Sequence, residues 1–162
     1  MSQTTHQCNR FNSLDVYCIT VWGNTCTSYI EPLERIVKRA VRLISGSNRL
    51  AHTAPLFQNL NILPVTKLLV HSIQLFMYKY YHKLLPRMFV PYFVNNFDVH
   101  GYHTRQSGSL HVSYNKSISI RYTGVNVWNY FSKRIEPNMP YHLYTKYLKR
   151  HVLINEVAHL VK

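Results

Sequence analysis

Acidic residues are scarce in this chain of 162 residues, which has six Asp and Glu side chains against 19 Lys and Arg. The six carboxylates are spread along the sequence, and no two are adjacent. Two-metal phosphoryl transfer and glycoside hydrolysis both depend on clustered carboxylates, so neither class of enzyme is predicted. The formal net charge of +13 at pH 7 instead indicates an anionic partner, either nucleic acid or an acidic membrane surface.

Cysteine is equally sparse. The three cysteines, Cys8, Cys18 and Cys26, all lie within the first 26 residues and form no Cys-x-x-Cys pair. An odd number without that spacing argues against a disulfide framework, a zinc ribbon and a redox dithiol. No local signature supplies a histidine base for Cys18 or Cys26, so a catalytic thiol is not expected. Such a chain is typical of a reducing compartment.

Long hydrophobic runs are missing as well. The N-terminal residues contain no apolar segment of the kind found in a secretory signal. The most apolar long stretch, residues 62–85, is interrupted by lysines and histidines, so it does not predict a membrane span. We therefore expect a soluble intracellular protein, cytoplasmic or nuclear, that is neither secreted nor transmembrane.

Hydrophobic residues make up 46% of the chain, which is enough to build a core and excludes a disordered tail. The pattern predicts a mainly α fold, formed by a small helical domain. We divide the chain into an N-terminal extension (1–12), a helical region (13–90), a Tyr/Ser/Asn-rich loop region (91–124) and a C-terminal helical segment (125–162). Alternation over residues 117–122 favours a short strand, which leaves room for one β-hairpin.

The clearest helix is predicted over residues 29–45. Pro32 is expected in its first turn and Gly46 at its stop. Its apolar face is formed by Leu33, Ile36, Val37, Ala40, Val41 and Ile44. A basic stripe at i, i+3, i+4 and i+7 lies opposite that face and consists of Arg35, Lys38, Arg39 and Arg42. These cations repel one another, and only Glu34 is expected to offset them. The stripe favours an anionic ligand, and a solvated helix face is the alternative.

A long helix is predicted to open at Pro64 and to end near Leu84, because Pro86 follows. His71 and His82 are expected on its surface. Its predicted apolar positions are Leu69, Ile73, Phe76, Met77, Tyr80 and Leu84, with Val65 and Leu68 flanking them.

Residues 13–23 fit the spacing of both a helix and a strand. Ser13 as an N-cap and Gly23 as a stop favour the helix. Later in the chain, a short helix is predicted to follow Gly124, and a last helix is predicted over residues 141–157. Tyr144, Tyr147, Leu148 and Val152 are expected on one face of the last helix.

A second group of cations lies on another face of the last helix. Lys146, Lys149 and Arg150 share that face, and with Lys133 and Arg134 they make the C-terminal third basic. Lys146, Lys149 and Arg150 are further candidates for binding nucleic acid, and a solvated helix end is the alternative. Trp22 and Trp128 are expected in the core. The candidates for stacking on nucleic-acid bases are Tyr102, Tyr114 and Tyr122, beside Arg105 and Arg121.

The ten histidines raise the question of a metal site. His100 and His103 form a His-x-x-His pair, His111 follows, and Asp98 is the nearest acid. Zinc needs a further ligand of fixed geometry, which this spacing does not supply. We predict no metal and no cofactor.

Several short motifs occur in an order that resembles one family. They span residues 15–151 and are Tyr17-Cys18, Val21-Trp22-Gly23-Asn24-Thr25, the RIVKRAVRLISG segment, His52-Thr53-Ala54-Pro55-Leu56-Phe57, Leu60-Asn61-Ile62-Leu63, Met77-Tyr78-Lys79, Leu85-Pro86, His100-Gly101-Tyr102-His103-Thr104-Arg105-Gln106, Ser119-Ile120-Arg121-Tyr122-x-Gly124, Val127-Trp128-Asn129 and Tyr147-Leu148-Lys149-Arg150. Each is weak alone, but in this order they resemble the segment downstream of the polymerase active site in non-LTR (LINE-class, jockey-like) retrotransposon reverse transcriptases.

The resemblance implies a thumb and the segment after it, which lie against the template–primer duplex. The helix with Arg35, Lys38, Arg39 and Arg42 matches the basic helix that follows the W-G-N-T motif of the family. Arg105 is then a candidate phosphate contact and Trp128 a packing anchor. The T-R-Q and W-N motifs have no chemical role that the residues assign.

The departures from the family are equally informative. No Asp-Asp pair is present, and the fingers, palm, endonuclease domain and terminal zinc knuckle are absent from these residues. We therefore expect no enzymatic activity of the chain on its own. The expected function is non-catalytic, sequence-nonspecific binding of an RNA–DNA hybrid or duplex, with the rest of a reverse transcriptase on another chain as a further partner.

Two rival hypotheses stay open. A transposon-derived remnant or protein-interaction module without nucleic-acid function would expose the apolar surface that normally packs on a palm. Peripheral membrane attachment is the other, but the apolar face predicted over residues 29–45 has no Trp or Phe and is typical of a protein core.

Overall fold

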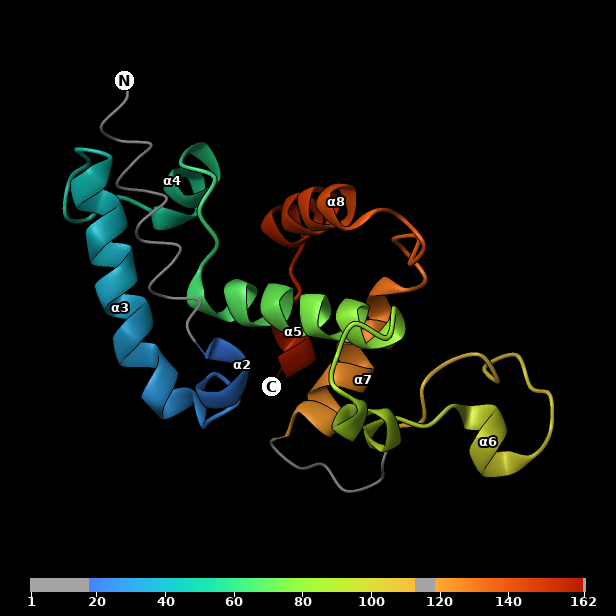
Figure 1. The fold of residues 1–162 in the computed structure, drawn as a ribbon. Helices are drawn as coiled ribbons and strands as arrows, with labels where there is room; N and C mark the ends of the chain where they lie inside the picture. Colours follow the sequence, from blue (N-terminus) through green and yellow to red (C-terminus); the bar gives the residue numbers. More distant parts are fainter. Residues whose placement is uncertain (1–17, 113–118, 162) are drawn as a thin grey trace.

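Helix α5 (Val65–Tyr81) crosses the middle of the structure and contacts α2, α3, α7 and α8 (Figure 1). The computed structural model describes residues 18–112 and 119–161. Its other elements are α2 (Ile19–Trp22), α3 (Thr27–Ile44), α4 (Thr53–Asn59), the 3₁₀ helix η1 (Arg87–Tyr92), α6 (Asn96–His100), α7 (Ile120–Phe131), α8 (Tyr141–Ile154) and the 3₁₀ helix η2 (Ala158–Val161). The mainly α prediction is confirmed.

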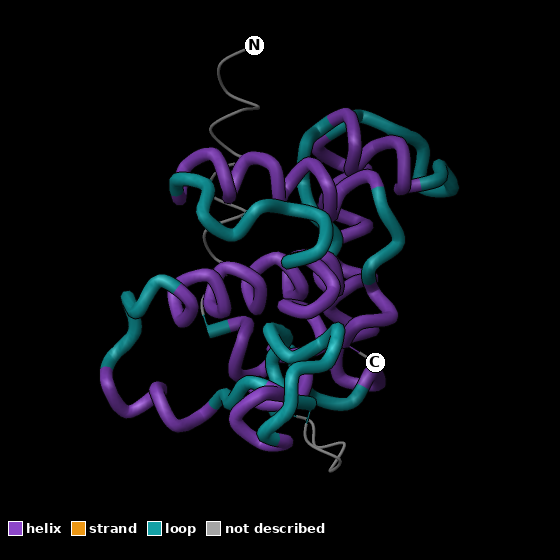
Figure 2. Tube along the Cα trace, turned by 90° about the vertical axis from the view of Figure 1, so that its right-hand side faces the viewer, coloured by secondary structure: helices purple, strands orange, loops and turns teal. Residues whose placement is uncertain are grey.

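The described residues contain no strand, and Figure 2 shows helices joined by loops. An isolated antiparallel bridge pairs Asn95 with Leu110. The strand predicted over residues 117–122 is therefore wrong from residue 120 onward, where α7 begins, and Ser117 and Ile118 lie outside the described residues. The helix that was predicted to follow Gly124 includes this residue, since Gly124 is buried inside α7.

Gly124 instead allows two helices to approach closely. A Cβ atom at this position would lie 3.0 Å from the Met77 Sδ atom of α5. The absent side chain thus lets α7 pack tightly on α5. Ile120 and Tyr122 alternate as in a strand, but in α7 they lie roughly 200° apart around the helix, and both are half-buried.

Two clusters of buried apolar residues hold the helices together. The larger surrounds α5 and includes Ile73, Met77, Phe131 and Leu148. The smaller lies between α3, α4 and the start of α5 and consists of Ile30, Val37, Val41, Phe57, Ile62 and Val65. Trp22 packs against both clusters, which supports the predicted core role of this side chain.

Helix α3 ends as predicted, but it begins two residues early. Gly46 has φ +63°, and the amides of Gly46 and Ser47 donate to the carbonyls of Leu43 and Arg42 at 3.2 and 3.0 Å. This double hydrogen bond is the Schellman arrangement, which favours glycine at the left-handed position. Because the helix starts at Thr27, Pro32 lies in the second turn and not in the first.

The apolar face of α3 is narrower than predicted. Val37 and Val41 are buried, and Leu33, Ala40 and Ile44 are half-buried. Ile36 is 62% exposed, so its placement on the buried face is wrong. Helix α4 and the start of α5 cover only the side of α3 that carries Val37 and Val41.

Helix α5 begins at Val65, with Pro64 as its N-cap, and ends at Tyr81. Lys83 adopts φ +57°, and the Leu84 amide donates to the Lys79 carbonyl at 2.8 Å. This Schellman end stops the helix before Pro86 can, so the prediction that α5 runs to Leu84 is wrong. Leu84 is exposed and does not join the core.

The remaining helix boundaries follow the predictions in part. Gly23 caps α2 as predicted, while Ser13 lies outside the described residues. Helix α8 ends at Ile154, three residues before the predicted end. Lys67 of α5 fixes that end, since its Nζ atom donates to the Leu153 carbonyl at 3.0 Å. No helix of the described residues is long and apolar enough to span a membrane.

Candidate nucleic-acid interface

The basic stripe lies on α3, at one side of the molecule in Figure 1. Its charge is partly balanced along the helix. Arg35 Nη2 lies 3.5 Å from Glu31 Oε2, and Lys38 Nζ lies 3.6 Å from Glu34 Oε2. The prediction that Glu34 alone offsets the stripe is therefore wrong, because Glu31 also lies one turn from a cation.

Arg39 and Arg42 line a hollow that continues beyond the end of α3. Arg42 Nε donates to the Ala51 carbonyl at 3.0 Å, so the side chain ties the helix to the following loop. That loop brings Arg49 to the same hollow. The hollow, called the α3 groove below, has a volume of about 510 Å³ and is lined by Arg35, Ile36, Arg39, Arg42, Leu43, Ser47, Arg49 and Leu50.

The α3 groove combines arginines with exposed aliphatic side chains and contains no carboxylate in its lining. Leu43 and Leu50 are 78% and 89% exposed. Tyr29, Ile36 and Leu43 recur every seven residues, which places them along one line on the outside of the helix. The sequence pattern places Ile36 on the apolar face of the helix, whereas the structure places it on this exposed line.

A second basic hollow, the α8 groove, lies between α8 and the end of α4. Its volume is about 400 Å³, and its lining is Asn61, Leu143, Lys146, Tyr147, Lys149, Arg150 and Leu153. The three predicted cations of α8 thus share one groove. The four residues predicted to share one face of this helix divide, since Tyr144, Leu148 and Val152 are buried whereas Tyr147 is 54% exposed.

Asn61 reaches the α8 groove because of the way α4 ends. It adopts φ +54°, and the following amide of Ile62 donates to the Phe57 carbonyl at 3.0 Å. Asparagine tolerates the left-handed conformation that this turn needs. An Asn two residues after the helix is a local signal for such a turn, but the contact with α8 depends on tertiary packing.

His71 of α5 lies close to α8 and not on a free surface, which corrects the prediction for this residue. Burial and, to a smaller extent, the positive charge of Lys149 lower the pKa of its imidazole from 6.5 to about 4, against a hydrogen bond with the Thr145 backbone that raises it. Burial also lowers the pKa of the Lys149 ammonium group. His71 is therefore neutral at pH 7. The other histidine predicted on the surface of this helix, His82, is half-buried, and its Nε2 atom lies 2.9 Å from the Pro137 carbonyl oxygen.

The predicted stacking residues do not gather into one site. Arg105 and the exposed Tyr102 lie in the turns after α6, at the opposite end of the molecule from α3 (Figure 1). Tyr122 is half-buried in α7, and Tyr114 lies outside the described residues. The Arg121 guanidinium lies 4.1 Å from the centre of the Tyr92 ring, so it already has an aromatic partner.

The W-N motif has a structural role. Trp128 is buried and its ring lies 5.2 Å from that of Tyr81, as expected for a packing anchor. Asn129 Nδ2 donates to the Leu110 carbonyl at 2.9 Å, and its Oδ1 atom accepts from the Leu110 amide at 3.1 Å. The side chain thus binds both backbone groups of one residue and holds the loop that contains Arg105 against α7.

The histidines of this loop make other contacts. The ring centroid of His103 lies 4.6 Å from that of Phe97, and those of His100 and His111 are 5.7 Å apart. Among residues 18–112 and 119–161, no three His, Cys, Asp or Glu side chains lie close enough together to hold a metal ion.

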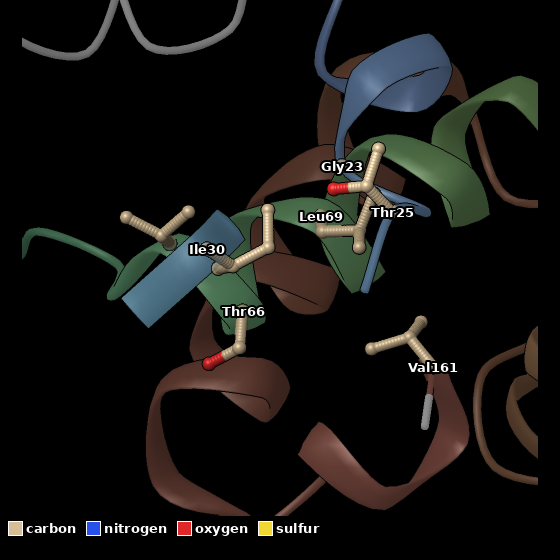
Figure 3. Close-up of a pocket in the computed structure, with 7 residues that line it drawn as sticks. Gly23, Thr25, Ile30, Thr66, Leu69 and Val161 are labelled. Carbon is tan, nitrogen blue, oxygen red and sulfur yellow. The ribbon is translucent and has the colours of Figure 1, made fainter. Parts of the chain in front are cut away.

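A small pocket lies where α2, α3, α5 and η2 meet. It is lined mainly by apolar atoms, with Ile30 and Leu69 facing Val161 across it (Figure 3). Its volume of about 40 Å³ has room for no more than a few water molecules. The pocket is a packing defect at a helix junction and not a substrate site.

Comparison of the chain with protein-family models, with curated proteins and with solved structures finds no significant match. The site therefore has to be assigned from its own chemistry. That chemistry consists of two basic grooves, one on α3 and one on α8. Sequence reasoning missed three of their lining residues, Arg49, Asn61 and Tyr147, as site residues.

Proposed function

We propose that this chain binds nucleic acid through its phosphates, without sequence preference and without catalysing a reaction. The observation that carries the proposal is the α3 groove, where Arg35, Arg39, Arg42 and Arg49 line one hollow that has no carboxylate in its lining. Guanidinium groups bind phosphate oxygens with two parallel hydrogen bonds, which makes arginine well suited to this ligand.

The arginines of the α3 groove differ in whether other residues of the chain already bind their guanidinium groups. Within the described part of the chain, no carboxylate lies within 4.0 Å of Arg39 or Arg49. Arg42 keeps its terminal nitrogens for a ligand while its Nε atom holds the loop. Arg35 must release Glu31 or share it. Arg39 and Arg49 are accordingly the strongest phosphate contacts of the groove.

The order of the short sequence motifs supports a more specific proposal about the kind of protein segment that does this binding. We propose that the chain is a thumb-like segment of a non-LTR retrotransposon reverse transcriptase, separated from its fingers and palm. An RNA–DNA hybrid is then the expected ligand, and a polymerase palm on another chain is an expected partner. A hybrid differs from B-form DNA by its A-like shape and by the 2′-hydroxyl groups of its RNA strand.

The test is fluorescence anisotropy with a labelled RNA–DNA hybrid over a salt series. Four phosphate contacts contribute roughly −3.6 to the slope of log affinity against log salt, or about a 150-fold loss between roughly 50 and 200 mM. Replacing Arg35, Arg39, Arg42 and Arg49 with Gln should remove this share of the slope.

A control variant separates the groove from the net charge. Gln at Lys79, Lys83, Arg87 and Lys133 removes four exposed cations that lie outside both grooves. This variant should keep most of the wild-type salt slope. Equal slopes for the two variants would contradict a role for the α3 groove, and no binding at about 50 mM salt would contradict the function.

The exposed line on α3 supports a second candidate, a protein-interaction module. Tyr29, Ile36 and Leu43 present apolar surface at the spacing that a partner helix recognises. Binding of this kind depends weakly on salt, in contrast to phosphate binding. A chain that stays monomeric at all concentrations and binds the hybrid with a steep salt dependence would argue against this candidate.

A further inference from the structure

We propose that the α8 groove holds an unpaired nucleotide, with its base stacked on Tyr147 and its flanking phosphates on Lys146 and Arg150. This inference rests on the proposed function and names a substrate class for one of its two grooves, single-stranded RNA or DNA.

Tyr147 differs from the other tyrosines of α8 in having an unoccupied ring. Tyr144 is buried and accepts a hydrogen bond from Gln74 Nε2 at 2.5 Å. The Tyr141 ring lies 5.7 Å from that of Tyr78. The Tyr147 side chain has neither a ring contact nor a hydrogen bond within residues 18–112 and 119–161, although it lines a groove. An exposed ring beside cations is the arrangement that binds bases of single strands.

Tyr147 and Arg150 form a ridge between two hollows. On one side is the α8 groove, and on the other is a hollow of about 550 Å³ between α8 and the segment after α7. Both residues line both hollows. Consecutive nucleotides of a single strand can therefore lie on either side of the ridge, with Arg150 within reach of the phosphate that joins them.

The rest of the α8 groove suits the other parts of a nucleotide. Its three cations are Lys146, Lys149 and Arg150, and no carboxylate lines it. Leu143 and Leu153 offer apolar surface for a sugar or the edge of a base. The Asn61 amide both donates and accepts hydrogen bonds, which matches the mixed polar edge of any unpaired base.

The two basic grooves are therefore chemically different. The α3 groove has arginines and aliphatic side chains but no aromatic ring, so it offers phosphate contacts without a stacking surface. The α8 groove adds an aromatic ring. Stacking on neighbouring base pairs covers the faces of bases inside a duplex, so only an unpaired, unstacked base can use Tyr147.

The test compares two fluorescein-labelled probes of about 12 nucleotides, oligothymidylate and an abasic oligomer with the same phosphates. Stacking of one base on an aromatic side chain predicts that wild-type protein binds oligothymidylate roughly 5- to 150-fold more tightly than the abasic oligomer. Tyr147→Ala should remove this difference, and Tyr147→Phe should retain it. Tyr29→Ala is the matched control, because Tyr29 is an exposed tyrosine of α3 that lines neither basic groove, and it should behave as wild type.

The outcomes separate this inference from the proposed function. Equal affinities for the two probes, with a steep salt dependence for both, would leave phosphate binding intact and overturn the base site. No binding of either probe would overturn both. Photocrosslinking of an oligomer with 5-iodouracil gives a second readout, since crosslinks at Tyr147 support the site and crosslinks confined to other aromatic residues overturn it. Because Tyr147 is exposed, the urea midpoint of Tyr147→Ala should match that of wild type.

Discussion

Acid should destabilise this fold through His71. The residue is half-buried, and its Nε2 atom is buried without a hydrogen-bond partner among the described residues. Its pKa falls from 6.5 to about 4 in the folded chain because burial and Lys149 disfavour the charged ring. The unfolded chain therefore binds a proton more readily than the folded chain, and the folded state loses stability as the pH falls from about 6.5 towards 4.

The size of the effect follows from the pKa change. A shift from 6.5 to about 4 corresponds to roughly 3 kcal/mol of unfolding free energy, present above pH 6.5 and lost below pH 4. About 2 kcal/mol of it is lost between roughly pH 7 and pH 5. For a domain of ordinary stability, about 5–15 kcal/mol, this loss is readily measured.

Urea denaturation at several pH values, followed by circular dichroism, measures the effect. His71→Gln removes the titrating ring, so its unfolding free energy should fall by about 2 kcal/mol less than that of wild type between roughly pH 7 and pH 5. His142→Gln, at an exposed position of α8, should keep the wild-type loss. His151 also has a pKa lowered by burial and by Arg134, but it is present in all three proteins and cancels in the comparison. Equal acid losses in wild type and His71→Gln would refute the reasoning.

Two other substitutions test the contacts that hold the loop after α6 against α7 and the contacts that hold α2 against α5. Asn129→Ala leaves the amide and carbonyl of Leu110 without their partners, so the unfolding free energy should fall by about 1–3 kcal/mol, and amide exchange at Leu110 should become faster. A normal exchange rate would show that the loop does not depend on this side chain. Gly23→Ala places a Cβ atom 2.7 Å from Leu69 Cδ1 and 2.5 Å from the Ile19 carbonyl oxygen, so the melting temperature should fall. An unchanged melting temperature would mean that α2 shifts freely on α5.

Sequence patterns predicted the features that depend on near neighbours in the chain. Helix α3 has a strong apolar repeat and a glycine at its end, and its extent is correct to within two residues at the start. The α5 end was missed because Lys83, and not glycine, takes the left-handed position. The start of α7 was missed because Ile120 and Tyr122 alternate as in a strand, whereas the buried residues of α7 begin only at Thr123.

The residues of the candidate site also divide into those that follow from near neighbours in the chain and those that depend on tertiary packing. The four cations of the α3 stripe were found from helical periodicity alone. Lys38 does not line the α3 groove, however, and Arg49 joins the other three there through a loop that folds back on Arg42. Tyr147 has the spacing of a core residue, but the buried stripe of α8 is narrow and leaves it outside. Periodicity gives the direction of a side chain on its helix, while the neighbouring helices decide how wide the buried stripe is.

The central place of α5 has a consequence for how the chain is made. Its buried residues are covered by α7 and α8, which begin about 40 and 60 residues after α5 ends. At translation rates of roughly 5–20 residues per second, that apolar face stays without α7 and α8 for about 2–12 s after α5 is synthesised. A polypeptide that stops before Ile120 never acquires them, so truncated products of this sequence are candidates for chaperone binding and aggregation, whereas the full chain buries the same surface in its core.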